Sequence, residues 1–526
     1  MEQTSEPSHA PIRSQQAPLA GPQLVIATIF VAMATFMTVL DTSIANVAIP
    51  SLSGELGVSV DEGTWVITIF AAANAVSIPL TGWLTQRVGQ VRLFVGSILG
   101  FVIASWLCGI APTLPFLLGA RVLQGIVAGP LIPLSQALLL SSWPKEKSGT
   151  ALSLWAVTAT VGPIAGPLLG GWLTDHYSWS WIFYVNIPVG IAAASVVWMI
   201  YQKRETPVVK LPIDLVGLGL LVAWVGALQV MLDKGEDLDW FSSPVIVALG
   251  ILALVCFAFF LVWELTEPHP IVDIKLFQQV NFRWGTIAIS VSYALYFGNL
   301  VLLPQWMQSY LGYTAFDAGK ITAPVGVFAL LLSPAIGRLM SRIDVRLMAT
   351  LAFLGYAGVF FLRSSYVSQI DAFHLVLPTL LQGIPVALWF VPLTAIILSE
   401  LPPERIPAAA GLSNFARIFC GAVGTSISTT VWNNRTILHH ARLIEQASVN
   451  NPVFAQQIDA LQTLLHVDQS TAYAMYNTTV TGQAVVMGLD DFFYISSVIF
   501  VLMIPLIWFT RSVGNGANVD AATAAH

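Results

Sequence analysis

The stretch "ELGVSVDEGTWVITIFAAANAVSIPLTGWLTQRVGQVRL", residues 55–93, decides the fold, because a second version of it occurs later in the chain. Residues 310–347 read "YLGYTAFDAGKITAPVGVFALLLSPAIGRLMSRIDVRL". In each copy a first glycine stands 25 residues before the glycine of a Gly-x-Leu-x-x-Arg turn. Many secondary transporters are built from internal repeats around a central site. Channels and membrane enzymes are duplicated too, so the repeat favours a transporter without excluding them.

The repeat continues downstream. "LQGIVAGPLIPL" (123–134) is echoed by "LQGIPVALWFVPL" (381–393), at an offset of 258 residues against 255 for the first pair. In this register Thr379 corresponds to Arg121. The positive charge is therefore not needed to build the helix, which makes Arg121 a candidate for function.

Composition places this repeat in a membrane. The 526 residues are 56% hydrophobic and only 10% charged, whereas a soluble protein carries about 25% charged residues. Apolar runs of about 20 residues, the length that a helix needs to cross a bilayer, recur from residue 24 to residue 510. These features predict an all-α polytopic membrane protein.

Apolar runs broken by charge, proline or glycine number fourteen. The predicted spans are 24–47, 64–85, 93–112, 115–137, 150–173, 181–201, 213–232, 244–263, 284–303, 319–339, 347–366, 373–398, 407–430 and 491–511. With both termini in the cytoplasm, cytoplasmic segments hold 15 of the 22 lysines and arginines and the opposite side holds five, among them Arg363. Such a bias follows the positive-inside rule and predicts cytoplasmic ends.

The predicted organisation is two six-helix halves with additions. It comprises a cytoplasmic tail 1–22, a bundle 23–203, a two-helix insert 204–275, a bundle 276–511 and a cytoplasmic tail 512–526. Within the second bundle, residues 433–490 form a mostly polar extracytoplasmic segment with helical stretches. Connections in compact folds are usually far shorter, so this segment is either an inert excursion or a partner-contacting element.

"FMTVLDTSIANVAIP" (36–50) places a carboxylate, Asp41, in the first span. Met33, Met37 and Asp41 lie at i, i+4 and i+8, on one face of a helix. An intramembrane acid is costly and by default marks a transport or proton path. The alternatives are a hydrated carboxylate near the interface or one that caps a neighbouring helix.

Arg121, in "GARVLQGIVAGPLIP", is the candidate counter-charge. It stands one and two turns before Gly125 and Gly129, and small residues admit a close neighbour. A guanidinium stays protonated, so it suits the tuning of a nearby acid. The alternative is a structural arginine that binds helix carbonyls. Arg417, in "LSNFARIFCGAVG", is a possible second buried charge.

"VGPIAGPLLGG" (161–171) spaces Gly162, Gly166 and Gly170 four residues apart, with prolines between them. This spacing predicts a groove for tight helix packing, and the prolines predict a bend. Such an element suits a rocking transporter, although ordinary helix packing explains it equally well. We find no sequence pattern of an enzyme, a metal site or a nucleotide-binding loop, and we expect no cofactor.

These residues carry a family resemblance. "LDTSIANVAIP", "GWLTQRVGQVRLF", "RVLQGIVAG" and "GPIAGPLLGG" resemble the motifs of helices 1, 2–3, 4 and 5 of the major facilitator superfamily. Together with "GTWVITIF", "LDKGEDLDWF", "HPIVDIKLF", "LPPER" and "GLSNFAR", they resemble the fourteen-span drug:proton antiporters, and most closely the EmrB-type multidrug efflux pumps, over about residues 22–511.

The resemblance implies roles for individual residues. Asp41 and Arg121 become the proton-coupling pair. The implied cytoplasmic conformational latch comprises Gly82, Arg87, Gly89 and Arg92. The implied antiporter element comprises Gly162, Gly166, Pro167, Gly170 and Gly171. The chain departs from the family at Gln86, where an aspartate is usual, at Gln90 and Val91, where a basic pair is usual, and mildly at Ser43, where threonine is usual. The missing aspartate puts a charge-relay role of this loop in doubt.

The resemblance also implies partners and a place in the cell. EmrB-type pumps work in the Gram-negative inner membrane with an EmrA-type periplasmic adaptor and a TolC-type outer-membrane channel. Residues 433–490 are the candidate docking surface.

We therefore expect a proton-driven antiporter that exports hydrophobic or amphipathic toxic compounds by alternating access. The alternatives are an exporter of a defined metabolite or fatty acid and a membrane sensor or scaffold on a transporter fold. Residues of polar, aromatic or methionine type near mid-span are expected to line the cavity: Met33, Met37, Asn74, Gln124, Tyr293, Tyr296, Asn299, Gln382, Trp389 and Asn414.

Overall fold

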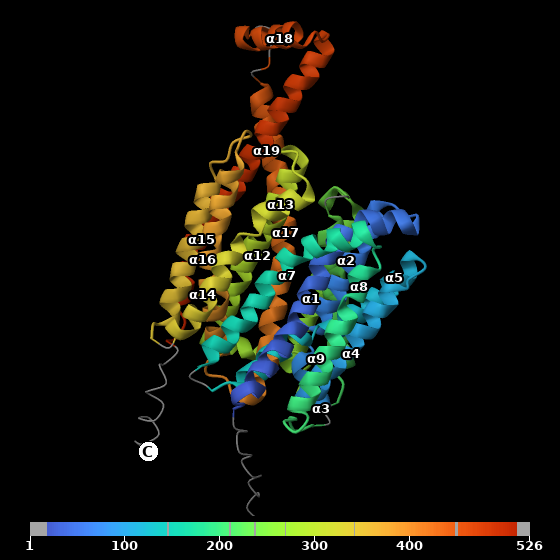
Figure 1. Cartoon of the computed structure of the whole chain (residues 1–526), viewed down its shortest axis with the longest axis vertical. Helices are drawn as coiled ribbons and strands as arrows, with labels where there is room; N and C mark the ends of the chain where they lie inside the picture. The colour runs from blue at the N-terminus through green and yellow to red at the C-terminus, as the bar shows by residue number, and fades with distance from the viewer. Residues whose placement is uncertain are drawn as a thin grey trace, which may run out of the picture.

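The computed structural model describes residues 18–144, 147–209, 212–235, 238–268, 270–340, 342–445, 447 and 451–512. Every regular element in these residues is a helix, which confirms the all-α prediction. Most of the two expected tails, residues 1–17 and 513–526, lies outside the described part of the chain. The two ends of the described chain lie at the same end of the bundle, the lower one in Figure 1.

The helices form two bundles side by side (Figure 1). The first contains α1 (Gly21–Leu56), α2 (Val60–Ser77), α3 (Thr81–Val88), α4 (Gln90–Gly109), α5 (Leu114–Ala128), α6 (Leu131–Ser142), α7 (Ser148–His176), α8 (Trp181–Tyr184) and α9 (Asn186–Tyr201). Between the halves in sequence come α10 (Leu215–Lys234) and α11 (Pro244–Thr266), which pack on each other.

The second bundle follows the short 3₁₀ helix Ile274–Gln278. It contains α12 (Val280–Tyr310), α13 (Ala315–Thr322), α14 (Val325–Leu339), α15 (Val345–Arg363), α16 (Ala372–Leu398), α17 (Ile406–Ile444), α18 (Pro452–Leu465), α19 (Gln469–Leu502) and α20 (Ile504–Trp508). The halves meet where α7 packs on α14 and where α17 packs on α6 and α3.

The helix lengths fit a membrane protein. Eleven described helices are long and apolar enough to span a bilayer, or twelve if α2 and α3, which meet at a 61° bend, count as one span. Helix α7 and the pair α13–α14 occupy the other two expected spans, 150–173 and 319–339. Fourteen spans therefore remain a prediction. Exposed apolar side chains such as Leu254, Phe259 and Val262 cover α11, as expected of a lipid-facing helix.

The repeat is visible in the backbone. Gly57 ends α1 at φ +67°, and Gly312, which follows α12, has φ +72°. Both values lie in the left-handed region, which glycine enters without a steric penalty. The two glycines thus turn the chain in the same way at corresponding places.

The turns continue into matching helix caps. Ser59 Oγ accepts a hydrogen bond from the backbone N–H of Glu62 at 3.1 Å, and Thr314 Oγ1 accepts one from the N–H of Asp317 at 3.1 Å. Each hydroxyl satisfies an N–H that a helix start leaves unpaired. In α2 the Glu62 carboxylate also accepts from the Ser59 N–H and completes a capping box, whereas in α13 the Asp317 carboxylate accepts from the Thr314 hydroxyl. The duplicated sequence therefore starts α2 and α13 with the same hydroxyl cap.

Helix α7 packs along α1 through its spaced glycines. A Cβ atom at Gly162 would lie 2.6 Å from Val39 Cγ1, and one at Gly170 would lie 2.8 Å from Ile44 Cγ1. At Gly166 it would overlap the hydroxyl of Ser43 and lie 3.0 Å from its carbonyl carbon. This contact is closer than any larger residue permits. The side chain of Pro167 lies outside what the structure describes.

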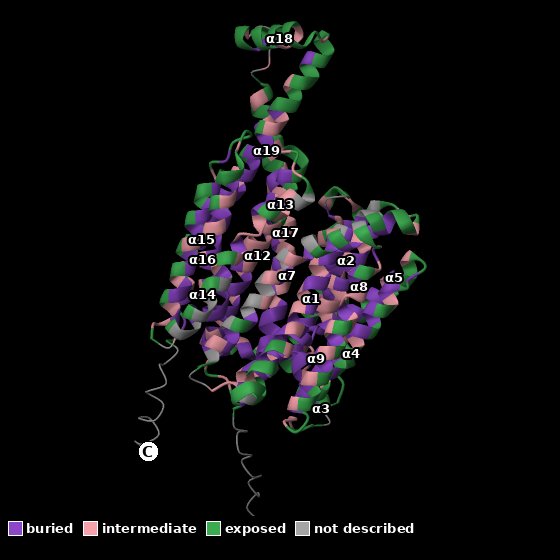
Figure 2. Ribbon diagram, in the orientation of Figure 1, coloured by how far each residue is buried: buried purple, intermediate pink, exposed green. Residues whose placement is uncertain are grey.

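The segment 433–490 is helical where the structure describes it. Helix α17 runs on to Ile444 and α19 begins at Gln469, so both extend beyond the bundle, and α18 lies across their ends (Figure 1). Most of α18 is exposed (Figure 2). Its buried residues, Phe454 and Ile458, form a small cluster with Ala472 of α19.

Replacement of Gly166 by alanine is expected to destabilise the protein by about 1–3 kcal/mol, the usual cost of overpacking. The overlap with Ser43 forces α1 and α7 apart. Gly171→Ala is the matched control, since a Cβ there has no heavy atom within 4 Å and alanine favours a helix. Thermal unfolding in detergent measures both variants. Equal melting temperatures for the two would contradict the packing argument.

Candidate functional site

A buried ion pair joins α1 and α5. Arg121 Nη1 donates to Asp41 Oδ2 at 2.6 Å, and both side chains are fully buried. Arg121 Nε also donates to the carbonyl oxygen of Val66 on α2 at 3.0 Å. The carboxylate is thus neither hydrated at an interface nor placed at a helix end. The arginine both balances the acid and binds a helix carbonyl.

Two amides complete the surroundings of Asp41. Asn186 Nδ2 donates to Asp41 Oδ1 at 2.8 Å, and Gln124 Nε2 donates to the same oxygen at 3.1 Å. Gln124 Oε1 accepts from Arg121 Nη1 at 2.6 Å, and Ser105 Oγ accepts from Gln124 Nε2 at 2.9 Å. Both oxygens of the buried carboxylate therefore have hydrogen-bond donors, from one cation and two neutral amides.

Sequence reasoning missed Asn186 and misassigned Gln124. Asn186 begins α9 in "FYVNIPVG", at the start of a predicted span, and its polar side chain inside an apolar run was the available signal. Gln124 was expected to line the substrate cavity, yet it bonds to both members of the ion pair. Gln124 follows Arg121 by about one helical turn, so the two side chains are neighbours on one face of α5.

A second buried arginine lies in the C-terminal half. Arg363 was expected among the extracytoplasmic segments, but its side chain is fully buried at the end of α15. Arg363 Nη1 donates to Asn299 Oδ1 at 2.6 Å, and Nη2 donates to Thr379 Oγ1 at 3.0 Å. Thr379 is the repeat equivalent of Arg121. The second half therefore also buries a cation, supplied by a different helix.

The ten expected cavity residues do not form one site. Met37 is buried in the N-terminal core, where its sulfur lies 3.3 Å from a Cβ built at Gly190. Asn299 binds Arg363. Asn74 contributes a backbone nitrogen 3.0 Å from a Cβ built at Gly125, as part of the α2–α5 contact. Met33 is half-buried on α1.

Three expected cavity residues stack on one another. The rings of Tyr293 and Tyr296 lie 5.8 Å and 5.5 Å from the ring of Trp389, between centroids. Gln382, on the same helix as Trp389, is buried with no hydrogen-bond partner for Nε2. These aromatic residues belong to α12 and α16, so they form one wall within the C-terminal half.

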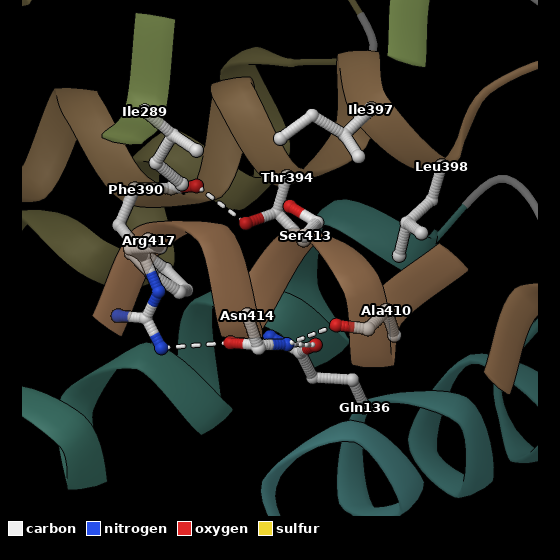
Figure 3. A pocket seen from close by; sticks show the side chains of 10 residues that line it. All are labelled: Gln136, Ile289, Phe390, Thr394, Ile397, Leu398, Ala410, Ser413, Asn414 and Arg417. Atoms are coloured by element: carbon white, nitrogen blue, oxygen red, sulfur yellow. Dashed lines mark hydrogen bonds between the residues drawn. The ribbon is translucent and has the colours of Figure 1, made fainter. Parts of the chain in front are cut away.

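Asn414 is the one expected cavity residue that lines the described cavity between the halves (Figure 3). The cavity is small, about 10 Å³, roughly the room that one water molecule needs. Its wall comes from α6, α12, α16 and α17: Gln136, Ile289, Phe390, Thr394, Ile397, Leu398, Ala410, Ser413, Asn414 and Arg417. Asn414 Nδ2 donates to Gln136 Oε1 at 2.8 Å and so joins the two halves.

The expected latch residues lie where α3 meets α17. A Cβ at Gly82 would lie 2.6 Å from the Cβ of Ala408, so the two halves approach closely there. Gly89 has φ +96° and separates α3 from α4. Arg87 lies over the ring of Trp83 at 5.3 Å, and Arg92 is exposed.

A carboxylate from another loop binds the segment that follows Gly89. Glu205, which follows α9, accepts hydrogen bonds from the backbone N–H groups of Val91 and Arg92, both at 2.9 Å. It thereby caps the start of α4, where a negative charge is favoured by the helix dipole. Gln86 contributes through its backbone, since its carbonyl accepts from Val209 N at 2.8 Å.

Comparison with known proteins agrees with this architecture. Residues 31–425 match the family described as Major Facilitator Superfamily. The crystal structure of the human organic anion transporter MFSD10 (TETRAN) has a TM-score of 0.58 at 12% identity, covering 93% of this chain and 100% of that one. At that identity the likeness shows the fold alone.

Two bacterial relatives are much more similar in sequence. The "Multidrug export protein EmrB" of Escherichia coli (strain K12) is 48% identical over 498 residues, which cover 94% of this chain and 97% of the relative. The "Fatty acid resistance protein FarB" of Neisseria gonorrhoeae is 47% identical over 494 residues, with the same coverage. The chain therefore belongs to the Major Facilitator Superfamily, among its EmrB-type multidrug efflux pumps, and is a membrane transporter and not an enzyme.

Proposed function

We propose that the chain exports hydrophobic or amphipathic toxic compounds in exchange for protons by alternating access. The observation that carries this proposal is the fully buried Asp41, which is held by one arginine and two neutral amides. An exporter of a fatty acid by the same mechanism is the second candidate, favoured by the similarity to the relative named as a fatty acid resistance protein.

The ion pair supplies a physical reason for coupling. While Asp41 is ionised, its charge balances Arg121 and closes α1 against α5. Protonation removes the negative charge and leaves a buried guanidinium without a counter-ion, which costs about 3–5 kcal/mol when a buried pair is broken. The bundle must relieve that cost by moving Arg121 or admitting water. Proton binding is thereby linked to a change of conformation.

The contact between the halves supports alternating access. They approach closely at Gly82 and Ala408, at the end of the bundle where the described termini lie. With the orientation expected from the lysines and arginines, this end faces the cytoplasm. The structure then corresponds to a state closed toward the cytoplasm, in which Asp41 takes up a proton from the outside as the drug leaves.

The projecting segment supports a tripartite assembly. Helix α18 and the ends of α17 and α19 lie beyond the bundle, at the end opposite the termini (Figure 1). Val453 and Leu464 are exposed apolar residues of α18, while Phe454 and Ile458 are buried. We assign the exposed face to an EmrA-type adaptor that connects the pump, in a Gram-negative inner membrane, to a TolC-type channel.

Asp41→Asn is expected to abolish drug-induced proton release from acidified inside-out vesicles, bringing it to the level of protein-free vesicles. An amide keeps the shape of the side chain but cannot bind and release the proton. Exchange of labelled for unlabelled drug, which needs no net proton movement, should persist and shows that the variant is folded.

Asp317→Asn is the matched control. Its carboxylate is exposed and pairs with Lys320 at 2.9 Å, so the same loss of charge occurs outside the buried cluster. We expect proton release as in the wild type. Proton release by Asp41→Asn at the wild-type rate would place the coupling group elsewhere.

The double variant Val453→Ser, Leu464→Ser is expected to lower co-purification of the EmrA-type adaptor and drug resistance of cells, while proton-coupled efflux in proteoliposomes stays intact. Both side chains are exposed, so the change should not disturb the cluster around Phe454. The control, Val367→Ser, removes an exposed apolar side chain from the connection between α15 and α16, outside residues 433–490. Unchanged adaptor binding in the double variant would remove α18 from the docking surface.

A further inference from the structure

Arg417 is a buried cation without a counter-ion. Only 5% of its surface is exposed, and Nη2 donates to Asn414 Oδ1 at 2.7 Å. Its Nε has no hydrogen-bond partner, and no described carboxylate lies within 4.0 Å of it. A buried charge is normally paired because desolvation is costly. Arg417 therefore has both charge and hydrogen-bonding capacity to offer a ligand.

Empty space lies beside this cation. Arg417 lines the cavity between the halves, and Figure 3 shows its guanidinium directed toward Asn414, with Gln136 of α6 on the far side. Thr394 and Ser413 add hydroxyl groups to the same wall. The cavity measures about 10 Å³, roughly enough for one water molecule, so a head group reaches Arg417 only when the two halves move apart.

An aromatic wall adjoins the charged end. The guanidinium carbon of Arg417 lies 4.5 Å from the ring centroid of Tyr293 and 4.9 Å from that of Phe390. Tyr293 stacks on Phe297 at 4.4 Å and on Trp389 at 5.8 Å. The ring faces attract the cation but carry no net charge, so they leave it unbalanced. Phe390 lines the cavity in this state, and Tyr293, Phe297 and Trp389 adjoin it without lining it.

The other buried arginines lack this combination. Arg121 is neutralised by Asp41. Arg363 has no described carboxylate within 4.0 Å either, but Asn299 and Thr379 bind both of its Nη atoms, and it does not line the cavity. Arg417 is thus the buried cation of the described chain that borders empty space.

We propose that Arg417 binds the anionic head group of a transported amphiphile, a monocarboxylate whose apolar tail lies along the wall of Tyr293, Phe297 and Trp389. This inference rests on the proposed function and goes further by naming the charge of one substrate class. The planar guanidinium offers two parallel N–H groups to a carboxylate. A cationic amphiphile with the same tail is repelled by Arg417 and has to bind elsewhere in the pump.

The test measures binding of labelled dodecanoate and of labelled dodecyltrimethylammonium to the full chain in phosphatidylcholine nanodiscs at pH 8. Arg417→Gln is expected to weaken dodecanoate binding by on the order of tenfold, the loss of a charge-assisted hydrogen-bonded pair. Binding of dodecyltrimethylammonium should stay equal or improve. Arg363→Gln, the matched control, removes the same charge away from the cavity and should leave dodecanoate binding within about twofold.

Gln136→Glu keeps the proposal testable should Arg417→Gln fail to fold. It places a carboxylate in the cavity wall while retaining an acceptor for Asn414. We expect it to exclude dodecanoate and to raise the melting temperature, because it supplies the missing counter-ion.

Three results would overturn the anion site. These are unchanged dodecanoate binding in Arg417→Gln and Gln136→Glu, an equal loss in Arg363→Gln, and abolition of wild-type dodecanoate binding by phosphatidylglycerol in the nanodisc, which would assign the site to a lipid head group. Failure of the wild type to exchange either amphiphile for protons would instead overturn the proposed function, whatever the binding results. The two failures are thus distinguishable.

Discussion

The cost of placing a charge in a medium that cannot hydrate it governs this structure. Asp41 and Arg121 are tolerated because each neutralises the other and because Asn186, Gln124 and the carbonyl of Val66 occupy most of their remaining hydrogen-bonding atoms. Four helices and the start of a fifth contribute to this cluster, so the packing of the N-terminal half is organised around it. Under the proposed function, a proton that binds Asp41 would disturb the contacts of all these helices together.

The two halves share a backbone plan but distribute charge differently. Matching glycine turns and helix caps show how closely the local structure is repeated. The N-terminal half has a balanced ion pair, whereas the C-terminal half buries Arg363 and Arg417 without a described carboxylate beside them. Under the proposed function, this asymmetry would give the halves different tasks: proton binding to the first and attraction of negative charge to the second.

The sequence was sufficient for the fold class, the repeat and the identity of the ion pair, because these depend on residue type and spacing. It failed for the cavity, since being polar or aromatic near mid-span does not tell which way a helix is rotated. Gln124 and Asn299 face buried arginines for that reason. Arg363 was missed because it stands at the end of an apolar run beside polar residues, where a loop is the normal expectation. The length of α17 was hidden too, since a helix that leaves the bilayer loses its apolar signal.

The segment that connects α9 to α10 affects which parts of the pump can move together. Glu205 binds the start of α4, Val209 N donates to the carbonyl of Gln86, and Trp83 Nε1 donates to the carbonyl of Pro212 at 3.2 Å. The described part of the chain that leads into α10 is therefore tied to the N-terminal half. Helix α10 also packs on α2 of that half, while toward the other half Ser426 Oγ donates to the Leu232 carbonyl and Trp224 packs on Phe415 and Phe419 of α17. The two additional helices thus bridge the halves, and any movement between the halves has to break or carry along the contacts of Trp224.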